Sequence, residues 1–249
     1  MSRSRPDPER SPRRLGGVLF DKDGTLVDFR TTWVPAYLGV AAELAAMASQ
    51  PTMADRLLAH MGYRLAEDAF DEASPLLWAT NVVIARHWST APGLGGIDVL
   101  EVVERHFNDL ERYPPRPVGD VAALFGRLRR HGLKVGLATM DSLAPTRATA
   151  ALLGITPALD FLACCDSGHG VKPEPGMVLA FCAACGLEPA EVAMVGDTPA
   201  DLTMGRAAGC GLVVGVLTGG APASSLVPLA DHVVASIMDL EPLLGSRIS

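Results

Sequence analysis

The chain has 249 residues, of which 49% are hydrophobic, and a formal net charge of −7 at pH 7. A chain of this length can bury a substantial core, and it contains no apolar run long enough to span a bilayer. Five arginines against two acidic residues give residues 1–14 a charge of +3, which leaves −10 for the remainder. This acidic body argues against nucleic acid as the main partner, and the missing apolar run argues against a membrane.

The first fourteen residues are rich in Ser, Pro and Arg, and they lack the apolar stretch of a secretion signal. We therefore expect a flexible tail at 1–14. The five cysteines form no paired framework, which favours a reducing cytoplasm. Cys182 and Cys185 are spaced to share one face of a helix. No second ligand pair accompanies them, so small buried residues are favoured over a zinc site.

A short apolar run at 18–20 leads into Asp21-Lys22-Asp23-Gly24. In an extended chain, side chains two residues apart face the same way, so Asp21 and Asp23 emerge together from the strand. Two carboxylates this close stay ionised only beside a cation, or one of them holds a proton. Mg²⁺ prefers carboxylate oxygen, and a carboxylic acid with a raised pKa can donate a proton. The alternative is an ordinary Asp-Gly turn.

Residues 31 to 113 show apolar residues at helical spacing, and prolines end this pattern at 114, 115 and 117. Helices are expected at 36–48, 53–61, 76–87 and 99–110. A helical block of this kind, following the first strand, is typical of an inserted lid over the carboxyl ends of strands. We therefore expect an α/β catalytic core at 15–29 and 114–249, with a helical cap at 30–113.

Beyond the prolines, helix and strand patterns alternate. Strands are expected at 133–138, 161–165, 192–195, 212–217 and 232–235. Helices are expected between them, at 121–130, 143–153, 175–185 and 199–208. This alternation predicts an α/β fold with a doubly wound parallel sheet flanked by helices, into which the helical cap is inserted.

Two polar residues of the core follow later strands. Thr139 ends the second strand, where its hydroxyl and the next backbone N–H groups could hold a phosphoryl oxygen. Helix capping can explain Asp141 or Ser142 beside it, but not Thr139. Lys172 precedes Pro173, which restricts its backbone to extended geometry. Its place at the same sheet edge favours a substrate contact over an ordinary solvated lysine.

Two further carboxylates follow the strand at 192–195. Thr198 as N-cap, Pro199 in the first turn and Asp201 three residues after the cap form a near capping box. Capping can explain Asp201, but it leaves Asp197 at the strand tip unexplained. A third carboxylate there is what a divalent cation shared with Asp21 and Asp23 would require.

In this order the motifs resemble the four motifs of the haloacid dehalogenase superfamily. Within it the chain is most similar to the phosphoglycolate-phosphatase-like group, whose core is Rossmann-like and whose insertion is a helical cap. The resemblance implies that Asp21 is the nucleophile and a Mg²⁺ ligand. It implies that Asp23 is the general acid and base and binds the metal through its backbone carbonyl. Asp197 would bind Mg²⁺, and Asp201 would support the metal directly or through water.

The resemblance also implies the residues that bind substrate. Thr139 would hold the phosphoryl group and Lys172 would neutralise its charge. Relatives often carry Asn after the motif-two Thr, whereas this chain has Met140, whose backbone N–H remains. Arg64 and Arg30 are the candidates from the cap for a substrate carboxylate, with solvated surface arginines as the alternative.

The function implied is Mg²⁺-dependent hydrolysis of a small, phosphoglycolate-like phosphate monoester through an aspartyl-phosphate. The partner would be a small phosphorylated metabolite, and the oligomeric state is open, with a homodimer among the alternatives. A phosphosugar mutase of the same fold and a non-catalytic phosphate-binding protein are competing interpretations. A signalling receiver domain is disfavoured, because it is about half this length and lacks a helical insert.

Overall fold

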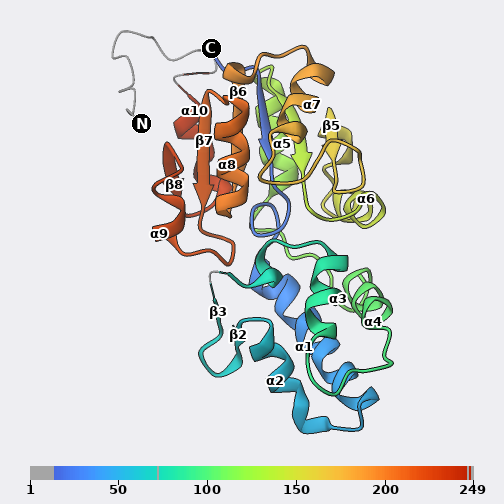
Figure 1. Cartoon of the computed structure of the whole chain (residues 1–249). Coiled ribbons are helices and arrows are strands. Elements are labelled where there is room, and N and C mark those ends of the chain that lie inside the picture. The colour runs from blue at the N-terminus through green and yellow to red at the C-terminus, as the bar shows by residue number, and fades with distance from the viewer. Residues whose placement is uncertain (1–13, 72, 246, 248–249) are drawn as a thin grey trace.

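A six-stranded parallel sheet organises one end of the molecule in our computed structural model, which describes residues 14–71, 73–245 and 247 (Figure 1). Its strands run in the order β5-β4-β1-β6-β7-β8. Their bounds are β1 Gly17–Phe20, β4 Lys134–Ala138, β5 Phe161–Ala163, β6 Val192–Gly196, β7 Leu212–Val216 and β8 His232–Val234. From β1 the chain adds β4 and then β5 on one side of the sheet, crosses back, and adds β6, β7 and β8 on the other side. The direction of winding therefore reverses between β1 and β6. Open α/β sheets place their sites at such a point.

Helices cover both faces of this sheet. They are α5 Val121–Arg130, α6 Leu143–Leu152, α7 Gly176–Cys185, α8 Pro199–Ala208, α9 Ala223–Leu226 and α10 Leu240–Leu244. Val18 and Phe20 of β1 pack in a buried cluster with α5 and α10, whereas Leu19 packs with α7 and α8. Alternate side chains of one strand thus enter two apolar layers, as the unbroken apolar run of a central parallel strand requires.

Between β1 and α5 the chain forms a largely helical insert, whose elements run from Phe29 to Phe107 and which Figure 1 shows beyond the end of the sheet toward which the strands point. Its elements are α1 Phe29–Met47, α2 Ala54–His60, β2 Tyr63–Arg64, β3 Ala69–Phe70, α3 Asn81–Ser89 and α4 Val99–Phe107. They enclose a hydrophobic cluster of their own, in which Trp88 is fully buried. Over the described ranges, no helix combines the length and apolarity that crossing a membrane demands.

The insert differs from its sequence-based prediction in two places. It contains the antiparallel hairpin β2–β3, because Gly62 and Asp68 adopt left-handed backbone conformations that turn the chain at each side of β2. The helix predicted at 76–87 is divided into a 3₁₀ turn at Pro75–Leu77 and α3. Thr80 begins α3 as its N-cap, with its side chain accepting a hydrogen bond from Val83 N.

The two chain segments that connect the insert to the sheet lie side by side. Asp28 N donates to Arg116 O at 2.7 Å, and Val118 N donates to Leu26 O at 3.0 Å. A bridge between Val27 and Pro117 lies between these bonds. We call this paired segment, residues 24–28 with 116–118, the stem. The chain therefore enters and leaves the insert at one place, next to the carboxyl end of β1.

Candidate active site

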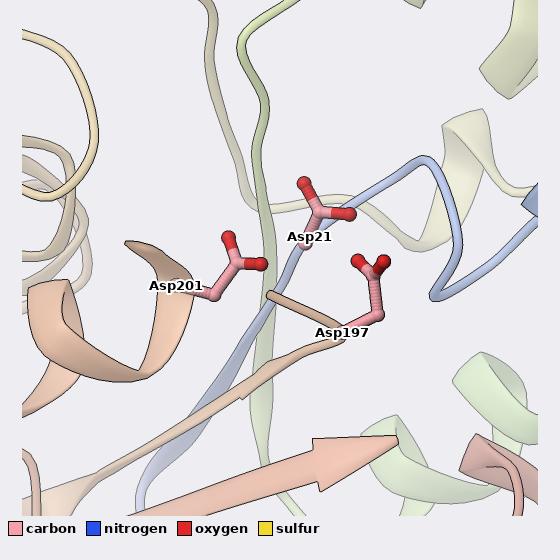
Figure 2. A group of neighbouring side chains, drawn as sticks. All are labelled: Asp21, Asp197 and Asp201. Carbon is pink, nitrogen blue, oxygen red and sulfur yellow. The ribbon is translucent and has the colours of Figure 1, made fainter. Parts of the chain in front are cut away.

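Three buried carboxylates meet at the carboxyl edge of the sheet. Asp21 follows β1, Asp197 follows β6, and Asp201 lies in the first turn of α8. Each offers an oxygen that lies within 4.8 Å of the others, and Figure 2 shows the three side chains directed toward one another. Strand register explains the meeting of Asp21 and Asp197, because Phe20 is paired with Val195 and these aspartates follow the ends of the two neighbouring strands.

The turn after β6 fixes Asp201. Asp201 Oδ2 accepts hydrogen bonds from Thr198 N at 3.0 Å and from Thr198 Oγ1 at 2.6 Å, while Asp201 N donates to Thr198 Oγ1 at 3.4 Å. The capping box predicted from the sequence is thus confirmed. It occupies one carboxylate oxygen of Asp201 and leaves Oδ1 directed to the cluster.

Lys172 lies among these carboxylates. Its Nζ donates to Asp21 Oδ1 and lies 2.6 Å from Asp201 Oδ1. Burial alone would lower the pKa of Lys172, but Asp201 and Asp21 raise it above its ordinary value, so the ammonium stays charged. Burial raises the pKa of Asp21 to about 7, although Lys172 opposes the shift. Burial, then Asp21 and Asp201, raise the pKa of Asp197 well above its ordinary value.

The carboxylate cluster fits a divalent cation. Among the described residues, no donor hydrogen-bonds to Asp21 Oδ2, and Asp201 Oδ1 has only its ion pair with Lys172. Asp197 receives a long hydrogen bond of 3.4 Å from Thr25 Oγ1. Buried carboxylate oxygens without donors are costly unless a cation contacts them. They are also the hard ligands that Mg²⁺ binds.

Asp23 faces away from the carboxylate cluster and toward the insert. Lys22 Nζ lies 2.7 Å from its Oδ2, and Trp33 Nε1 donates to its Oδ1 at 2.8 Å. Lys22 is 3% exposed and also lies 3.4 Å from Asp141 Oδ2. Burial opposes the charge of Lys22, but Asp23 and then Asp141 raise its pKa. A metal contact from Asp23 would therefore be made by its backbone carbonyl, the atom named in the prediction.

Lys22, Trp33 and Asp141 are site residues that the sequence analysis missed. Asp141 or Ser142 was expected to cap a helix. Ser142 is the N-cap of α6, but its side chain accepts no capping hydrogen bond from a described residue, and Asp141 Oδ1 accepts a hydrogen bond from Ser142 N at 2.8 Å. Its other oxygen faces Lys22. The sequence signal for Lys22 is its place between two aspartates in an apolar context, which disfavours free solvation. No local signal marks Trp33, whose partner Asp23 lies in another element.

Thr139 and Met140 line a cavity between the insert and the sheet. Thr139 Oγ1 accepts a hydrogen bond from Asp141 N at 3.1 Å, which leaves the hydroxyl proton available to a ligand oxygen. Asp21, Asp23, Lys172 and the other carboxylates lie at the floor of this cavity.

The structure does not bring Arg64 and Arg30 to this cavity. Arg64 is paired with Asp71 and with Glu67, whose Oε2 lies 2.7 Å from its Nε. Arg30 lies 2.7 Å from Asp68 Oδ1 and donates to the Asp68 carbonyl at 2.5 Å. Both arginines form ion pairs with acidic residues in or next to the hairpin β2–β3. The hairpin was absent from the prediction, and this absence explains the misplaced expectation.

The fold and the site together define an α/β enzyme whose reacting groups lie at the switch point of its sheet. The family model of the haloacid dehalogenase-like hydrolases matches residues 15–209, and the chain belongs to this family. The family predicted from the four motifs is thereby confirmed, as is the doubly wound parallel sheet.

Individual proteins of known name are similar to the chain at less than 30% sequence identity. The chain is 29% identical over 246 residues to phosphoglycolate phosphatase of Yersinia pseudotuberculosis, covering 94% of each chain. It is 26% identical over 198 residues to N-acetylmuramic acid 6-phosphate phosphatase of Pseudomonas putida, covering 79% of this chain and 80% of the relative. Among solved structures, a predicted phosphoglycolate phosphatase from Haemophilus somnus superposes with a TM-score of 0.69 at 18% identity, covering 92% and 97%.

Proposed function

We propose that the protein is a Mg²⁺-dependent phosphatase that hydrolyses a small phosphate monoester through an aspartyl-phosphate on Asp21. The observation that carries the proposal is the buried cluster of Asp21, Asp197 and Asp201 with Lys172, in which Asp21 Oδ2 has no hydrogen-bond partner among the described residues. A nucleophile needs such an unengaged oxygen. Membership of a hydrolase family with two phosphatases among its relatives supports the same activity.

The residues suggest how the reaction proceeds. Asp21 attacks phosphorus, the bond to the leaving oxygen breaks, and Asp23 protonates the departing alkoxide. Water then attacks phosphorus of the aspartyl-phosphate and Asp23 takes its proton, while the bond to the Asp21 oxygen breaks and releases inorganic phosphate and the free carboxylate. Lys172 and the Thr139 hydroxyl hold the phosphoryl oxygens during both steps. Bound Mg²⁺, held by Asp21, Asp197 and Asp201, would offset the repulsion between carboxylate and phosphate.

The substrate proposed here is defined only by its phosphate monoester. The relatives are named for phosphoglycolate and for a sugar acid phosphate, and phosphoglycolate was the substrate implied by the sequence resemblance. Such acids need a cation at the end away from the phosphate, and the two arginines expected to supply it lie elsewhere.

The five cysteines are free thiols, which supports the proposal of a reducing cytoplasm.

Release of inorganic phosphate separates hydrolysis from its alternatives. A phosphosugar mutase would use the same aspartates but return the phosphoryl group to a sugar hydroxyl. A phosphate-binding protein would bind an ester without turnover.

The decisive test is p-nitrophenyl phosphate with Mg²⁺. We expect phosphate release that EDTA abolishes and that Asp21→Asn lowers by about 10³-fold or more. The exposed residue Asp55 provides the matched control, because Asp55→Asn removes a carboxylate from the surface of α2. Circular dichroism would check that both variants fold. Full activity in Asp21→Asn, or activity indifferent to EDTA, contradicts the mechanism.

A further inference from the structure

The insert contributes an apolar and largely aromatic wall to the active-site cavity. Side chains from α1, from α4 and from the segment between β3 and α3 face the carboxylates and Lys172 across it. Six of them define the wall: Phe29, Trp33, Tyr37, Leu77, Trp78 and Phe107. The wall continues to the cavity mouth, where Trp78 is 48% exposed. A large exposed aromatic residue at the edge of a cavity offers unfilled apolar contact to a ligand.

Two of the three polar groups of this wall, those of Tyr37 and Trp33, are engaged within the protein. Tyr37 donates its hydroxyl to the Leu76 carbonyl at 2.7 Å, and Trp33 donates its ring N–H to Asp23. Burial raises the pKa of Tyr37 well above its ordinary value, so its hydroxyl stays neutral. The rings also hold one another, with Phe107 packed edge-on against Trp33 at 5.1 Å between centroids. The wall therefore presents mainly ring carbons to a ligand, with Trp33, Tyr37 and Phe107 held by these contacts.

Among the described residues, no basic side chain that lines the cavity is free to pair with a second anionic group on a substrate. Among the described residues that line it, Lys172 is the one basic side chain, and it is shared between Asp21 and Asp201. Nearby, Lys22 is shared between Asp23 and Asp141. A substrate carboxylate would have to leave water for a space between an apolar wall and these aspartates. Burial of an unpaired charge is strongly unfavourable.

Given the proposed phosphatase activity, on which this step rests, we infer that the natural substrate is a phosphate ester of an uncharged alcohol with an aromatic or apolar body. The phosphate lies against Lys172 and Thr139, and the body of the alcohol lies against the wall of the insert. The class excludes phosphoglycolate and other phosphorylated carboxylic acids. The Asn81 amide at the start of α3, which also lines the cavity, is suited to a neutral polar substituent on this body.

A matched pair of ligands tests this inference by binding alone. Benzyl phosphate and 4-(phosphonooxymethyl)benzoate differ by one carboxylate and share the same ester. Their dissociation constants would be measured by calorimetry on Asp21→Asn with Mg²⁺, so that turnover does not interfere. We expect benzyl phosphate to bind about tenfold or more tightly than its carboxylate counterpart, and more tightly than phosphoglycolate by a similar factor. Equal or reversed affinities, or no binding of benzyl phosphate at millimolar concentration, would overturn the inference.

A charge placed on the wall provides the second arm. Trp78→Arg, added to Asp21→Asn, should cut the preference for benzyl phosphate by about tenfold, because the guanidinium pairs with the carboxylate. Val82→Arg is the control, since Val82 is equally exposed at 48% but does not line the cavity. An equal change in both variants contradicts a role for the wall. If the wild type releases phosphate from no ester while the binding preference holds, the proposed function fails and the inference about its substrate falls with it. Phosphate release from p-nitrophenyl phosphate without the binding preference overturns this inference alone.

Discussion

Asp23 is held by donors from two parts of the chain. Lys22 is its neighbour in the motif, whereas Trp33 comes from α1 of the insert. Both fix the direction of a carboxylate that keeps 20% of its side chain exposed to the cavity. A general acid must meet the leaving oxygen at hydrogen-bond distance, so its orientation matters as much as its pKa.

Replacement of Asp23 should separate substrates by their leaving groups. We expect Asp23→Asn to slow hydrolysis of an alkyl phosphate by about 10²–10⁴-fold, because an alkoxide must be protonated as it leaves. The loss on p-nitrophenyl phosphate should be far smaller, since nitrophenolate leaves without a proton. Steady-state kcat on the two esters is the measurement. Equal losses on both would assign Asp23 a structural role.

Loss of the Trp33 indole N–H alone should also slow alkyl phosphates more than aryl phosphates, but by less than the loss of Asp23 itself. Trp33→Phe keeps a ring against Tyr37 and Phe107 but removes the hydrogen bond to Asp23. We expect kcat for the alkyl ester to fall by about tenfold to a hundredfold, the scale of one lost hydrogen bond to a charged group. The aryl ester should change little. A uniform loss, or a rise in KM alone, would show that Trp33 acts on binding.

At the scale of elements, the strands of the sheet could be predicted and the details of the insert could not. β1, β4 and β6 are apolar except for Lys134 at the start of β4, and polar residues follow their ends, so the sequence marks their bounds to within one residue. The hairpin β2–β3 has two residues in each strand, too few for a periodic pattern. The contact from Trp33 to Asp23 depends on how α1 packs over the sheet, which no local pattern encodes.

Asp160 shows how a loop carboxylate joins two strands and a helix. It precedes β5, and its Oδ2 accepts from Val135 N of β4 at 2.9 Å and from Arg129 of α5 at 2.5 Å. Burial favours its neutral form, but the bonds from Val135, Arg129 and Lys134 lower its pKa below the ordinary value of 3.8 overall. Because the folded pKa is the lower one, the charged carboxylate stabilises the fold above pH 3.8. That contribution is lost as the pH falls through the folded pKa.

Neutralising this carboxylate should therefore destabilise the protein in a pH-dependent manner. We expect Asp160→Asn to lower the free energy of unfolding by about 1 kcal/mol at pH 7. The difference from wild type should shrink as the pH approaches 3. Urea unfolding at pH 7, 5, 4 and 3 measures it, with Asp55→Asn as the surface control. A difference that is constant over this range would attribute the loss to packing.

At the scale of the whole molecule, the carboxylate cluster opposes folding until a cation arrives. Asp21, Asp197 and Asp201 are all buried, with one lysine among them. Removing one carboxylate should thus help the metal-free protein. We expect Asp197→Asn to raise its unfolding temperature by about 2–4 °C for each kcal/mol of repulsion relieved.

With Mg²⁺ bound, the wild type should unfold at a higher temperature than Asp197→Asn, which reverses the order expected for the metal-free proteins. Mg²⁺ binds the folded wild type and should raise the unfolding temperature in proportion to the logarithm of its concentration. Asp197→Asn should lose most of this shift. Differential scanning calorimetry makes the comparison. Each protein is measured with about 10–20 mM EDTA, a large excess over trace metal, and again with added Mg²⁺ and no EDTA. A Mg²⁺ shift as large in the variant as in wild type would exclude Asp197 as a ligand.

The stem makes the insert a replaceable module. Its two strands of backbone, 24–28 and 116–118, are joined by hydrogen bonds at Asp28 and Val118, so a tight turn could connect them in place of the whole insert. The buried clusters around the sheet draw none of their residues from between Phe29 and Tyr113. Exchange of one insert for another through these two adjacent crossings would leave Asp21, Asp197 and Asp201 where they are and would remove the hydrogen bond from Trp33 to Asp23. In such a lineage, the carboxylate cluster would be inherited separately from substrate choice, whereas the orientation of Asp23 would be inherited with the insert.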